Sequence, residues 1–261
     1  MNFVRAKKHL GQHFLKDEEA ARRIADSLTL HGGCRRVLEV GPGTGALTTH
    51  LLQRTDIDLS CIELDAESVV HLRAKWPHLK VVYGDLLQLD LEHVATPPLA
   101  VIGNFPYNIS TQIIFKVLAH RDSVPEVVGM FQKEVADRLC AGPGNRTYGI
   151  TSVLARLWYT LEPLFTVEAD AFIPPPKVRS AVIRMRRNAR TALPVDEKLL
   201  ASLVKTAFGQ RRKTLHNALK GFAPLGGKVP EAYARKRAEE LSEEDFLTLA
   251  TACTGPGGGA A

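Results

Sequence analysis

Short apolar runs, separated by amphipathic segments of helical periodicity, limit the fold of this 261-residue chain more than any other feature. The runs lie at residues 35–41, 59–64, 80–84, 99–103 and 126–131. Segments such as ALTTHLLQ and STQIIFKVLAH between them place their apolar residues on one helical face. Regular alternation of strand and helix predicts an α/β fold with a mostly parallel sheet and helices on both of its faces.

Two later apolar runs, YTLEPLFTV (159–167) and SAVIRMR (180–186), stand on either side of the proline-rich segment IPPPKV. We expect both runs to be strands. Together they could form an antiparallel edge on the otherwise parallel sheet.

The pattern becomes helical beyond Asn188. Apolar residues from Leu199 to Phe208 fall on one face of a helix, and Ser242 with Asp245 forms a capping box for the last helix. The glycine-rich end of the chain has no residues that could pack into a core. We therefore predict a Rossmann-like sheet domain over residues 1–188, a small all-helical domain over 189–253 and a flexible tail over 254–261.

The composition is that of a soluble protein without structural disulfides. Apolar residues make up 45% of the chain and charged residues 24%. The four cysteines are widely spaced and form no CxxC pair, which argues against a zinc site and a disulfide framework. No apolar run reaches membrane-spanning length, and His9, Gln12 and His13 interrupt the segment where a signal peptide needs an apolar core. We expect a monomeric, cytoplasmic protein with no metal site and no membrane contact.

Basic residues are unevenly distributed, although the net charge is only +6. Three segments, 1–16, 177–190 and 205–220, carry arginines and lysines without any acid. Patches of this kind suit a polyanion such as a nucleic acid, although each one alone is also compatible with solvated surface charge.

The stretch EVGPGTGALT follows the first predicted strand and opens a helix. Glycines at such a turn let the backbone approach a ligand closely, and Gly41, Gly43 and Ala46 fit the G-x-G-x-x-G/A pattern of dinucleotide sites. Glu63 lies at the carboxyl end of the second predicted strand, where a carboxylate can accept hydrogen bonds from both ribose hydroxyls. These residues favour an adenosine-containing ligand over a plain strand-to-helix turn.

NAD and S-adenosylmethionine both contain adenosine, and further residues distinguish between them. Pro42 removes a backbone donor from the glycine loop, which matters less when no pyrophosphate must be bound. Asp85 follows the third predicted strand and is placed for an adenine amino group, with a helix N-cap as its alternative role. The tetrapeptide NFPY then ends the fourth strand, where substrate meets cofactor, and hydride transfer has no evident use for it.

The tetrapeptide NFPY, residues 104–107, suits a methyltransferase that acts on an amino group. The exocyclic nitrogen of adenine is a poor nucleophile because its lone pair is delocalised into the ring. Acceptors for its two hydrogens, the Asn104 side-chain oxygen and the Phe105 carbonyl, would favour a pyramidal nitrogen with its lone pair directed at a methyl sulfonium. Pro106 fixes the turn, and Tyr107 offers a stacking face for a base that has left its stack. The alternative interpretation is a strand-ending turn with two aromatic rings in the core.

Several motifs, in this order and spacing, resemble those of the ribosomal RNA adenine dimethyltransferase family. They are KKHLGQHFLKD, LEVGPGTGALT, IELD, GDLL, NFPYNIST, F-x-PPPKV-x-SAV and FGQRRKTLHNAL. The resemblance extends from about Lys7 to the last predicted helix, and it is to the branch that acts on the small ribosomal subunit. It implies a class I methyltransferase fold with S-adenosylmethionine as methyl donor and S-adenosylhomocysteine as product. It also implies dimethylation of two adjacent adenosines near the 3′ end of 16S ribosomal RNA, on a late small-subunit assembly intermediate.

The resemblance further implies roles for individual residues. Phe172 would be the second aromatic ring, which holds the target base against Tyr107. The donor would be bound by Gln12, His13, Leu15, Gly41, Gly43, Glu63, Leu64, Asp85, Leu86 and Asn104. The RNA would be bound by Lys7, Lys8, Lys177, Arg179, Arg211, Arg212 and Lys213. His13 stands where many members have asparagine, and it can still donate or accept through one ring nitrogen.

Three other functions fit parts of this pattern. An NAD-dependent oxidoreductase fits the glycine loop, but NFPY and the lack of a second substrate domain of useful size disfavour it. A catalytically silent RNA-binding assembly factor would keep the fold, but Asn104, Tyr107 and Glu63 are all intact. A methyltransferase of the antibiotic-resistance branch, which acts on the large subunit, has related motifs. The segment FGQRRKTLHNAL favours the small-subunit branch over it.

Overall fold

The computed structural model describes residues 4–226 and 228–254, and its contacts divide the chain into two compact units. The first, here called the sheet unit, runs to Ala136 and resumes over Thr160–Arg187. The second, the helical unit, takes Asp137–Tyr159 and continues from Asn188. The helical unit thus includes a segment, Asp137–Tyr159, that the sequence placed in the first domain. The tail expected over 254–261 lies outside the described residues except for Thr254.

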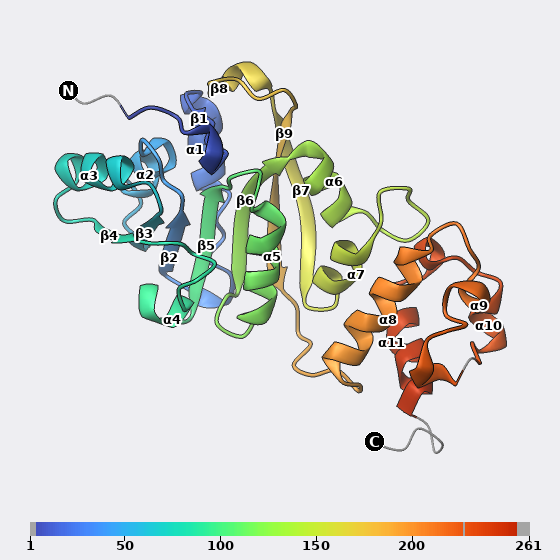
Figure 1. The fold of residues 1–261 in the computed structure, drawn as a ribbon. Helices are drawn as coiled ribbons and strands as arrows, with labels where there is room; N and C mark the ends of the chain where they lie inside the picture. Colours follow the sequence, from blue (N-terminus) through green and yellow to red (C-terminus); the bar gives the residue numbers. More distant parts are fainter. Residues whose placement is uncertain (1–3, 227, 255–261) are drawn as a thin grey trace. The chain divides into compact units, whose positions relative to one another are not determined.

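Among the described residues, seven strands form one sheet in the order β4-β3-β2-β5-β6-β9-β7 (Figure 1). Their bounds are β2 Arg36–Val40, β3 Asp58–Glu63, β4 Lys80–Tyr83, β5 Leu99–Asn104, β6 Glu126–Gln132, β7 Tyr159–Val167 and β9 Ser180–Arg187. The pairs β3–β4, β2–β3, β2–β5 and β5–β6 are parallel, and β6–β9 is antiparallel. The predicted mostly parallel sheet with an antiparallel edge is therefore confirmed.

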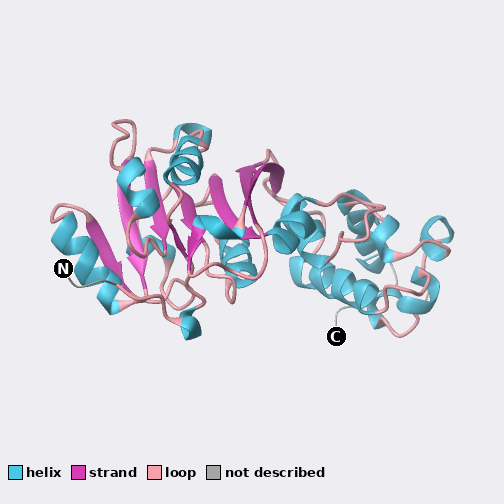
Figure 2. Ribbon diagram, turned by 90° about the horizontal axis from the view of Figure 1, so that it is seen from above, coloured by secondary structure: helices cyan, strands magenta, loops and turns pink. Residues whose placement is uncertain are grey.

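Helices stand on both sides of this sheet (Figure 2). In the sheet unit they are α1 Glu18–Asp26, α2 Ala46–Leu51, α3 Ala66–Lys75, α4 Leu91–Val94 and α5 Ser110–Ala119. The central strands β2 and β5 are buried over nearly their whole length because both of their faces are covered, which explains their continuous apolar runs. Helix α1 buries one face, with Ala21 and Ile24 in the core beside the sheet, and its charged residues face outward.

The chain changes direction across the sheet next to β2. From β2 the chain proceeds to β3 and β4 on one side, whereas β5 and β6 are added on the other side. The loops that leave the carboxyl ends of β2 and β5 therefore diverge, and such a switch point is where open α/β sheets bind ligands.

A small two-stranded ribbon, which the sequence did not predict, lies next to the sheet. Strand β1 (Phe14–Leu15) pairs antiparallel with β8 (Phe172–Ile173), with Phe14 opposite Ile173 and Leu15 opposite Phe172. Leu15 and Phe172 point into the core cluster beneath α1 and α2. The ribbon joins the N-terminal residues to the proline-rich segment.

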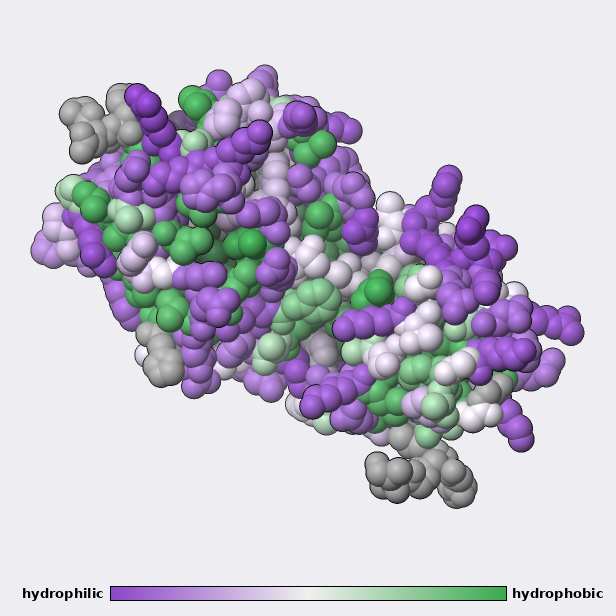
Figure 3. Space-filling view, viewed as in Figure 1, coloured by the Kyte–Doolittle hydropathy of each residue, from purple (hydrophilic) through white to green (hydrophobic). Residues whose placement is uncertain are grey.

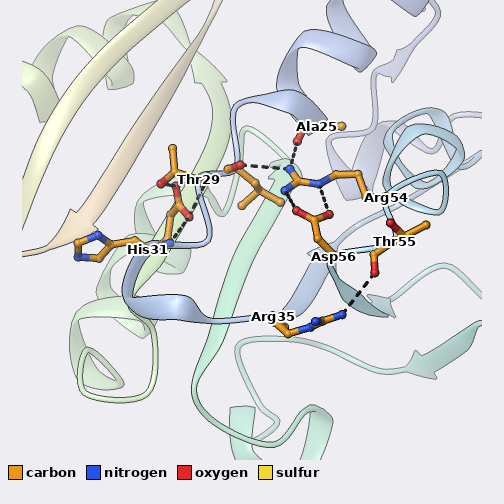
Figure 4. Close-up of polar contacts among 9 residues, drawn as sticks. Ala25, Thr29, His31, Arg35, Arg54, Thr55 and Asp56 are labelled. Atoms are coloured by element: carbon orange, nitrogen blue, oxygen red, sulfur yellow. Dashed lines mark hydrogen bonds and ion pairs between the residues drawn. The ribbon is translucent and has the colours of Figure 1, made fainter.

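Buried polar groups fix the loops at the amino ends of the parallel strands, at the end of the sheet opposite the switch point. Glu126, the first residue of β6, is fully buried and accepts hydrogen bonds from Thr29 N, Thr29 Oγ1 and His31 N at 2.8–3.2 Å. Arg54 donates to the carbonyl of Ala25, in the last turn of α1, and to that of Leu28, just beyond the helix, and it forms an ion pair with Asp56 (Figure 4). A buried carboxylate requires such donors, so the loop that enters β2 is fixed by Glu126.

The helical unit consists of short helices around a small apolar core. Its helices are α7 Ile150–Arg156, α8 Glu197–Gly209, α9 Leu215–Ala218, α10 Glu231–Ala234 and α11 Glu243–Thr251, and α6 (Lys133–Cys140) runs from one unit into the other. The predicted capping box is present, since Ser242 Oγ accepts from Asp245 N at 3.1 Å and the Asp245 carboxylate accepts from Ser242 N at 2.9 Å. No helix in the described part of the chain has the length and hydropathy needed to cross a membrane.

Candidate active site

A pocket opens at the carboxyl ends of β2, β3, β4 and β5, at the switch point of the sheet. The space between its walls, counted together with the open solvent at its mouth, is about 1100 Å³. Its walls are the glycine loop after β2, the strand ends near Glu63 and Asp85, the tetrapeptide NFPY and residues 10–15 of the N-terminal segment. Figure 3 shows apolar side chains grouped near the middle of the visible face of the sheet unit, surrounded by hydrophilic ones. All of the predicted donor-binding residues line this pocket.

The glycine loop needs glycine both for its conformation and for its packing. Gly43 and Gly45 have φ angles of +57° and +85°, in the left-handed region. A Cβ atom on Gly43 would lie 2.9 Å from the Phe14 ring, and one on Gly45 would lie 2.5 Å from the Trp76 ring. The two aromatic rings therefore pack directly on the loop and hold its backbone against the pocket.

Glu63 joins the glycine loop to the loop that follows β3. Its Oε2 accepts from Gly43 N at 2.9 Å, and its Oε1 accepts from Asp65 N at 2.8 Å. Burial raises the pKa of this carboxyl group, and the backbone donors oppose that shift. A carboxylate oxygen has two lone-pair sites, so each oxygen can accept one more hydrogen bond from a ligand hydroxyl.

Glu39 is a second buried carboxyl group in the pocket wall, and it was not among the residues predicted for the site. Thr48 Oγ1 donates to its Oε2 at 2.7 Å, and burial raises its pKa to about 7. The signal that could have identified it is one acidic residue within the apolar run VLEVG, because an unpaired charge in a central strand is costly.

Asp85 closes a turn and does not cap a helix, which was its expected alternative role, and it also faces the pocket. Its Oδ1 accepts from Leu87 N at 2.9 Å, which closes a turn of the chain after β4. No described residue donates to its Oδ2. Leu86 is buried and Leu64 is half exposed, and both line the pocket as apolar surfaces near this carboxylate.

Asn104 ends β5 with its side chain oriented by the N-terminal segment. Its Nδ2 donates to the His13 carbonyl at 2.9 Å. Because a carbonyl only accepts, the amide nitrogen must face His13, and the amide oxygen is left as an acceptor. No described residue donates to this oxygen, nor to the Phe105 carbonyl that follows it.

The Phe105 ring is part of the core, as the alternative interpretation of NFPY proposed for both aromatics. It is 1% exposed and packs edge-on against Phe131, with ring centroids 5.1 Å apart. Gly103 and Gly129 face each other on β5 and β6, and a Cβ on either would lie within 3 Å of this ring. Phe105 can therefore act in the pocket only through its backbone.

Tyr107 is held from two sides. Its hydroxyl group forms a hydrogen bond of 2.6 Å with Ser180 Oγ at the start of β9, and burial raises its pKa. Its ring is stacked on the His13 ring, with centroids 5.3 Å apart and 29° between the planes. The His13 Nδ1 atom donates to the Pro174 carbonyl at 2.7 Å, because that carbonyl can only accept. His13 was predicted as a donor-binding residue. Its ring also contacts Tyr107, the residue predicted to stack on the base.

Phe172 does not face Tyr107 in this structure. The pairing of β1 with β8 turns its side chain inward with Leu15, and the ring is 1% exposed within the core cluster. It does not line the pocket. The ring that contacts Tyr107 is that of His13, so the predicted second aromatic ring for the base requires correction.

Residues 7–15, here called the N-terminal strap, are tied to the sheet unit at their beginning as well. The Lys7 backbone nitrogen donates to Gln12 Oε1 at 2.8 Å. The Lys7 ammonium group forms ion pairs with Asp65 and Glu67 at the start of α3, and the hydrogen bond to Asp65 raises its pKa. Lys7 therefore has intramolecular partners where the sequence predicted an RNA phosphate, and Gln12 supports the strap.

The other predicted RNA-binding cations differ in their surroundings. In the sheet unit, Lys8 and Lys177 are exposed, and Arg179 lies 3.7 Å from Glu168 in an exposed ion pair. In the helical unit, Arg211 forms a 2.6 Å ion pair with Glu239 and lies over the Phe208 ring. Arg212 and Lys213 are exposed. Arg211 therefore already has an intramolecular partner. No cluster of metal-ligating side chains occurs among the described residues.

Comparison with known proteins gives consistent matches along the chain. A family model described as ribosomal RNA adenine dimethylase matches residues 3–253. A ribosomal RNA small subunit methyltransferase A from Cytophaga hutchinsonii is 51% identical over 257 residues, which cover 98% of this chain and 100% of that protein. Its counterpart from Flavobacterium johnsoniae is 51% identical over 253 residues, or 95% of this chain and 96% of that protein.

Solved structures extend the comparison to the fold. A dimethyladenosine transferase from Plasmodium falciparum matches with a TM-score of 0.76 at 26% identity, over 91% of this chain and 96% of that one. The 23S rRNA methyltransferase ErmE matches with a TM-score of 0.68 at 26% identity, over 91% of this chain and 99% of that one. The class I methyltransferase fold expected from the sequence is confirmed by these neighbours.

Proposed function

Because the chain belongs to the ribosomal RNA adenine dimethylase family, we propose that it dimethylates N6 of two adjacent adenosines near the 3′ end of 16S ribosomal RNA. The family match and the curated relatives confirm the predicted enzyme class, an rRNA methyltransferase, and set aside the oxidoreductase and the catalytically silent factor. The observation that carries the proposal is the pair of free acceptors, Asn104 Oδ1 and the Phe105 carbonyl, at the end of β5 beside the donor pocket.

The pocket residues fit S-adenosylmethionine, which supplies an electrophilic methyl sulfonium when bound. Glu63 retains one lone-pair site on each carboxylate oxygen, which matches the two hydroxyl groups of a ribose. Leu64 and Leu86 provide apolar surfaces for an adenine ring, and the free Oδ2 of Asp85 can accept from its amino group. The glycine loop lets the backbone approach the rest of the donor.

At the other end of the pocket, two acceptors activate the target amine. Asn104 Oδ1 and the Phe105 carbonyl accept the two N6 hydrogens of adenine, which favours a pyramidal nitrogen whose lone pair is available for the methyl group. The His13 carbonyl fixes the orientation of the Asn104 amide before the substrate arrives, so little reorganisation is needed during the reaction.

Tyr107 provides the platform for the target base. Its hydroxyl group is fixed by Ser180, so the ring is held in place and loses little entropy when a base stacks on it. A stack with an aromatic side chain contributes about 1–3 kcal/mol per base in single-strand binders. The base must leave its own stack to reach this ring.

The substrate is proposed from the relatives. The curated relatives at 51% identity are named small subunit methyltransferases, whereas the structural neighbour ErmE, named a 23S rRNA methyltransferase, is 26% identical. We therefore place the substrate in small-subunit assembly intermediates rather than in the large subunit. We further propose that the protein works as a monomer in the cytoplasm, where ribosomes assemble, and that Lys8, Lys177, Arg179, Arg212 and Lys213 contact the RNA backbone.

The test uses labelled S-adenosylmethionine and small-subunit particles from a strain that lacks this activity. Mapping of the labelled bases should find two adjacent dimethylated adenosines near the 3′ end of 16S RNA. Large-subunit particles from the same strain serve as the matched substrate control and should remain unlabelled. Label in the large subunit alone would overturn the proposed substrate, and label in neither would overturn the proposed reaction.

A further inference from the structure

A loop beside the base platform exposes two aliphatic side chains. The loop, residues 173–179 with the sequence IPPPKVR, connects β8 with β9 and is called here the proline loop. Ile173 is 57% exposed and Val178 is 46% exposed. Exposed aliphatic side chains are ordinary when they are isolated, so these two need evidence from their setting.

The proline loop is held rigidly in place. Its Pro174 carbonyl accepts from His13 Nδ1 at 2.7 Å, and its Arg179 carbonyl accepts from Lys133 N at 2.9 Å. The side chain of Pro176 is buried between these anchors. Because proline also fixes φ, the loop has few alternative conformations that could fold its aliphatic side chains away from solvent.

Both ends of the proline loop contact or pair with residues that line the pocket. Ser180, which follows the loop directly, bonds to the Tyr107 hydroxyl at 2.6 Å. At the other end, Ile173 pairs across the ribbon with Phe14, and paired residues in antiparallel strands share one face. Phe14 uses that face to pack on Gly43 of the glycine loop. The loop therefore extends from the donor side of the pocket to the base platform.

The charges on the loop suit a polyanion. Lys177 is exposed between the two aliphatic residues, and no described carboxylate forms an ion pair with it. Arg179 lies 3.7 Å from Glu168, but both side chains are more than half exposed, so this ion pair is weak and can be exchanged for a phosphate. Aliphatic side chains beside cations are the combination with which proteins separate stacked bases in nucleic acids.

We propose that Ile173 and Val178 pack against the bases that flank the target adenosine and keep it out of its stack, while Lys177 contacts a neighbouring phosphate. Unstacking a base costs a few kcal/mol, and aliphatic groups in the vacated space offset part of that cost. The proposal rests on the proposed function, because it requires an RNA substrate whose adenosine enters the pocket.

The test compares Ile173→Ser/Val178→Ser with two controls. Val70→Ser removes a 68% exposed valine from α3, outside the proline loop, and Ile173→Val/Val178→Ile preserves the aliphatic character. Single-turnover methylation is measured with unmodified small-subunit particles at saturating donor and particle. Base extrusion is measured with particles whose 16S RNA carries 2-aminopurine at a target position, because this base becomes more fluorescent when it leaves its stack.

We expect the serine double variant to bind S-adenosylhomocysteine as the wild type does, to methylate at least about tenfold more slowly and to lose the fluorescence increase. Such a tenfold change corresponds to about 1.4 kcal/mol, a fraction of the unstacking cost. Both controls should behave as the wild type.

Three outcomes would overturn the proposal. The first is a double variant whose rate and fluorescence stay within twofold of the wild type. The second is weaker particle binding with full fluorescence per bound particle, which would assign the loop to another contact, such as a ribosomal protein. The third is a wild-type enzyme that labels no adenosine in either subunit, which would overturn the proposed function as well and so differs from the first two.

Discussion

Replacing Asn104 with alanine tests the proposed chemistry most directly, because this side chain makes two separate contributions. Its amide nitrogen donates to the His13 carbonyl at 2.9 Å, and its oxygen, which has no donor among the described residues, is the proposed acceptor for the substrate. Removing a preorganised polar partner of a transition state typically lowers the rate by about 10²–10³-fold. A neutral hydrogen bond such as the one to His13 contributes only about 0.5–1.5 kcal/mol, or at most about tenfold in an equilibrium.

Asn104→Ala should therefore methylate at least about a hundredfold more slowly while its donor affinity falls by no more than about tenfold. Asn104→Asp is the matched variant, because it retains an acceptor but cannot donate to His13. The aspartate variant should lose as much donor affinity as the alanine variant does. At saturating donor it should nevertheless methylate faster than the alanine variant. Monomethyladenine offers only one hydrogen to the two acceptors, so monomethyl product should accumulate in the alanine variant.

The assay is single-turnover methylation of small-subunit particles at saturating donor, with donor affinity measured separately by calorimetry. This separation matters because Asn104 also lines the donor pocket. If the alanine variant stays within a few fold of the wild-type rate, Asn104 is a turn residue and the proposed activation of the amine is wrong. Equal rates for the alanine and aspartate variants would also contradict it.

Three further predictions address the donor site, the buried acid and the RNA. Glu63→Ala should weaken S-adenosylhomocysteine binding by about 1.5–3 kcal/mol in calorimetry, through loss of charged hydrogen bonds, and unchanged affinity would remove Glu63 from the site. The pKa of Glu39 is raised from 4.5 to about 7, so its contribution to stability is full below about pH 4.5 and declines as the pH rises to about 7. The loss amounts to up to about 3 kcal/mol at 1.36 kcal/mol per pKa unit. The unfolding free energy of the wild type relative to Glu39→Gln should decline over this range, and a difference independent of pH would contradict the shift. Replacing Arg212 and Lys213 with glutamine should flatten the salt dependence of particle binding by about one unit of slope per lost phosphate contact. A slope equal to that of the wild type would show that both are solvated surface residues that do not contact phosphate.

Local sequence patterns were sufficient to predict the strands of the sheet and the pocket at their carboxyl ends. The apolar runs at 35–41 and 99–103 became β2 and β5, because strands buried on both faces need continuous apolar sequence. The carboxyl ends of parallel strands share one edge, so Glu63, Asp85 and Asn104 could be brought together from their positions alone. The capping box at Ser242 is equally local.

The remaining features depend on contacts between residues far apart in the sequence. Strands β1 and β8 have two residues each, too few to show any periodicity, and their register decides that Phe172 faces the core. Likewise, the acids that pair with Lys7 and Arg211 lie far along the chain, so a basic segment could not reveal that these two charges are already neutralised. Glu39 was not predicted as a site residue because, in the sequence, one acid within an apolar run appears only as an interruption of the strand pattern.

His13 connects these non-local contacts, and its position explains why the N-terminal strap belongs to the active site. Its carbonyl orients the Asn104 amide, its ring stacks on Tyr107, and its Nδ1 holds the Pro174 carbonyl of the proline loop. One residue thus links the acceptor of the amine hydrogens, the base platform and the loop that we propose supports base extrusion. The parallel sheet alone supplies a donor pocket that is common to many methyltransferases. We propose that, in this chain, residues before the first parallel strand turn that pocket into a site with a defined place for an adenine.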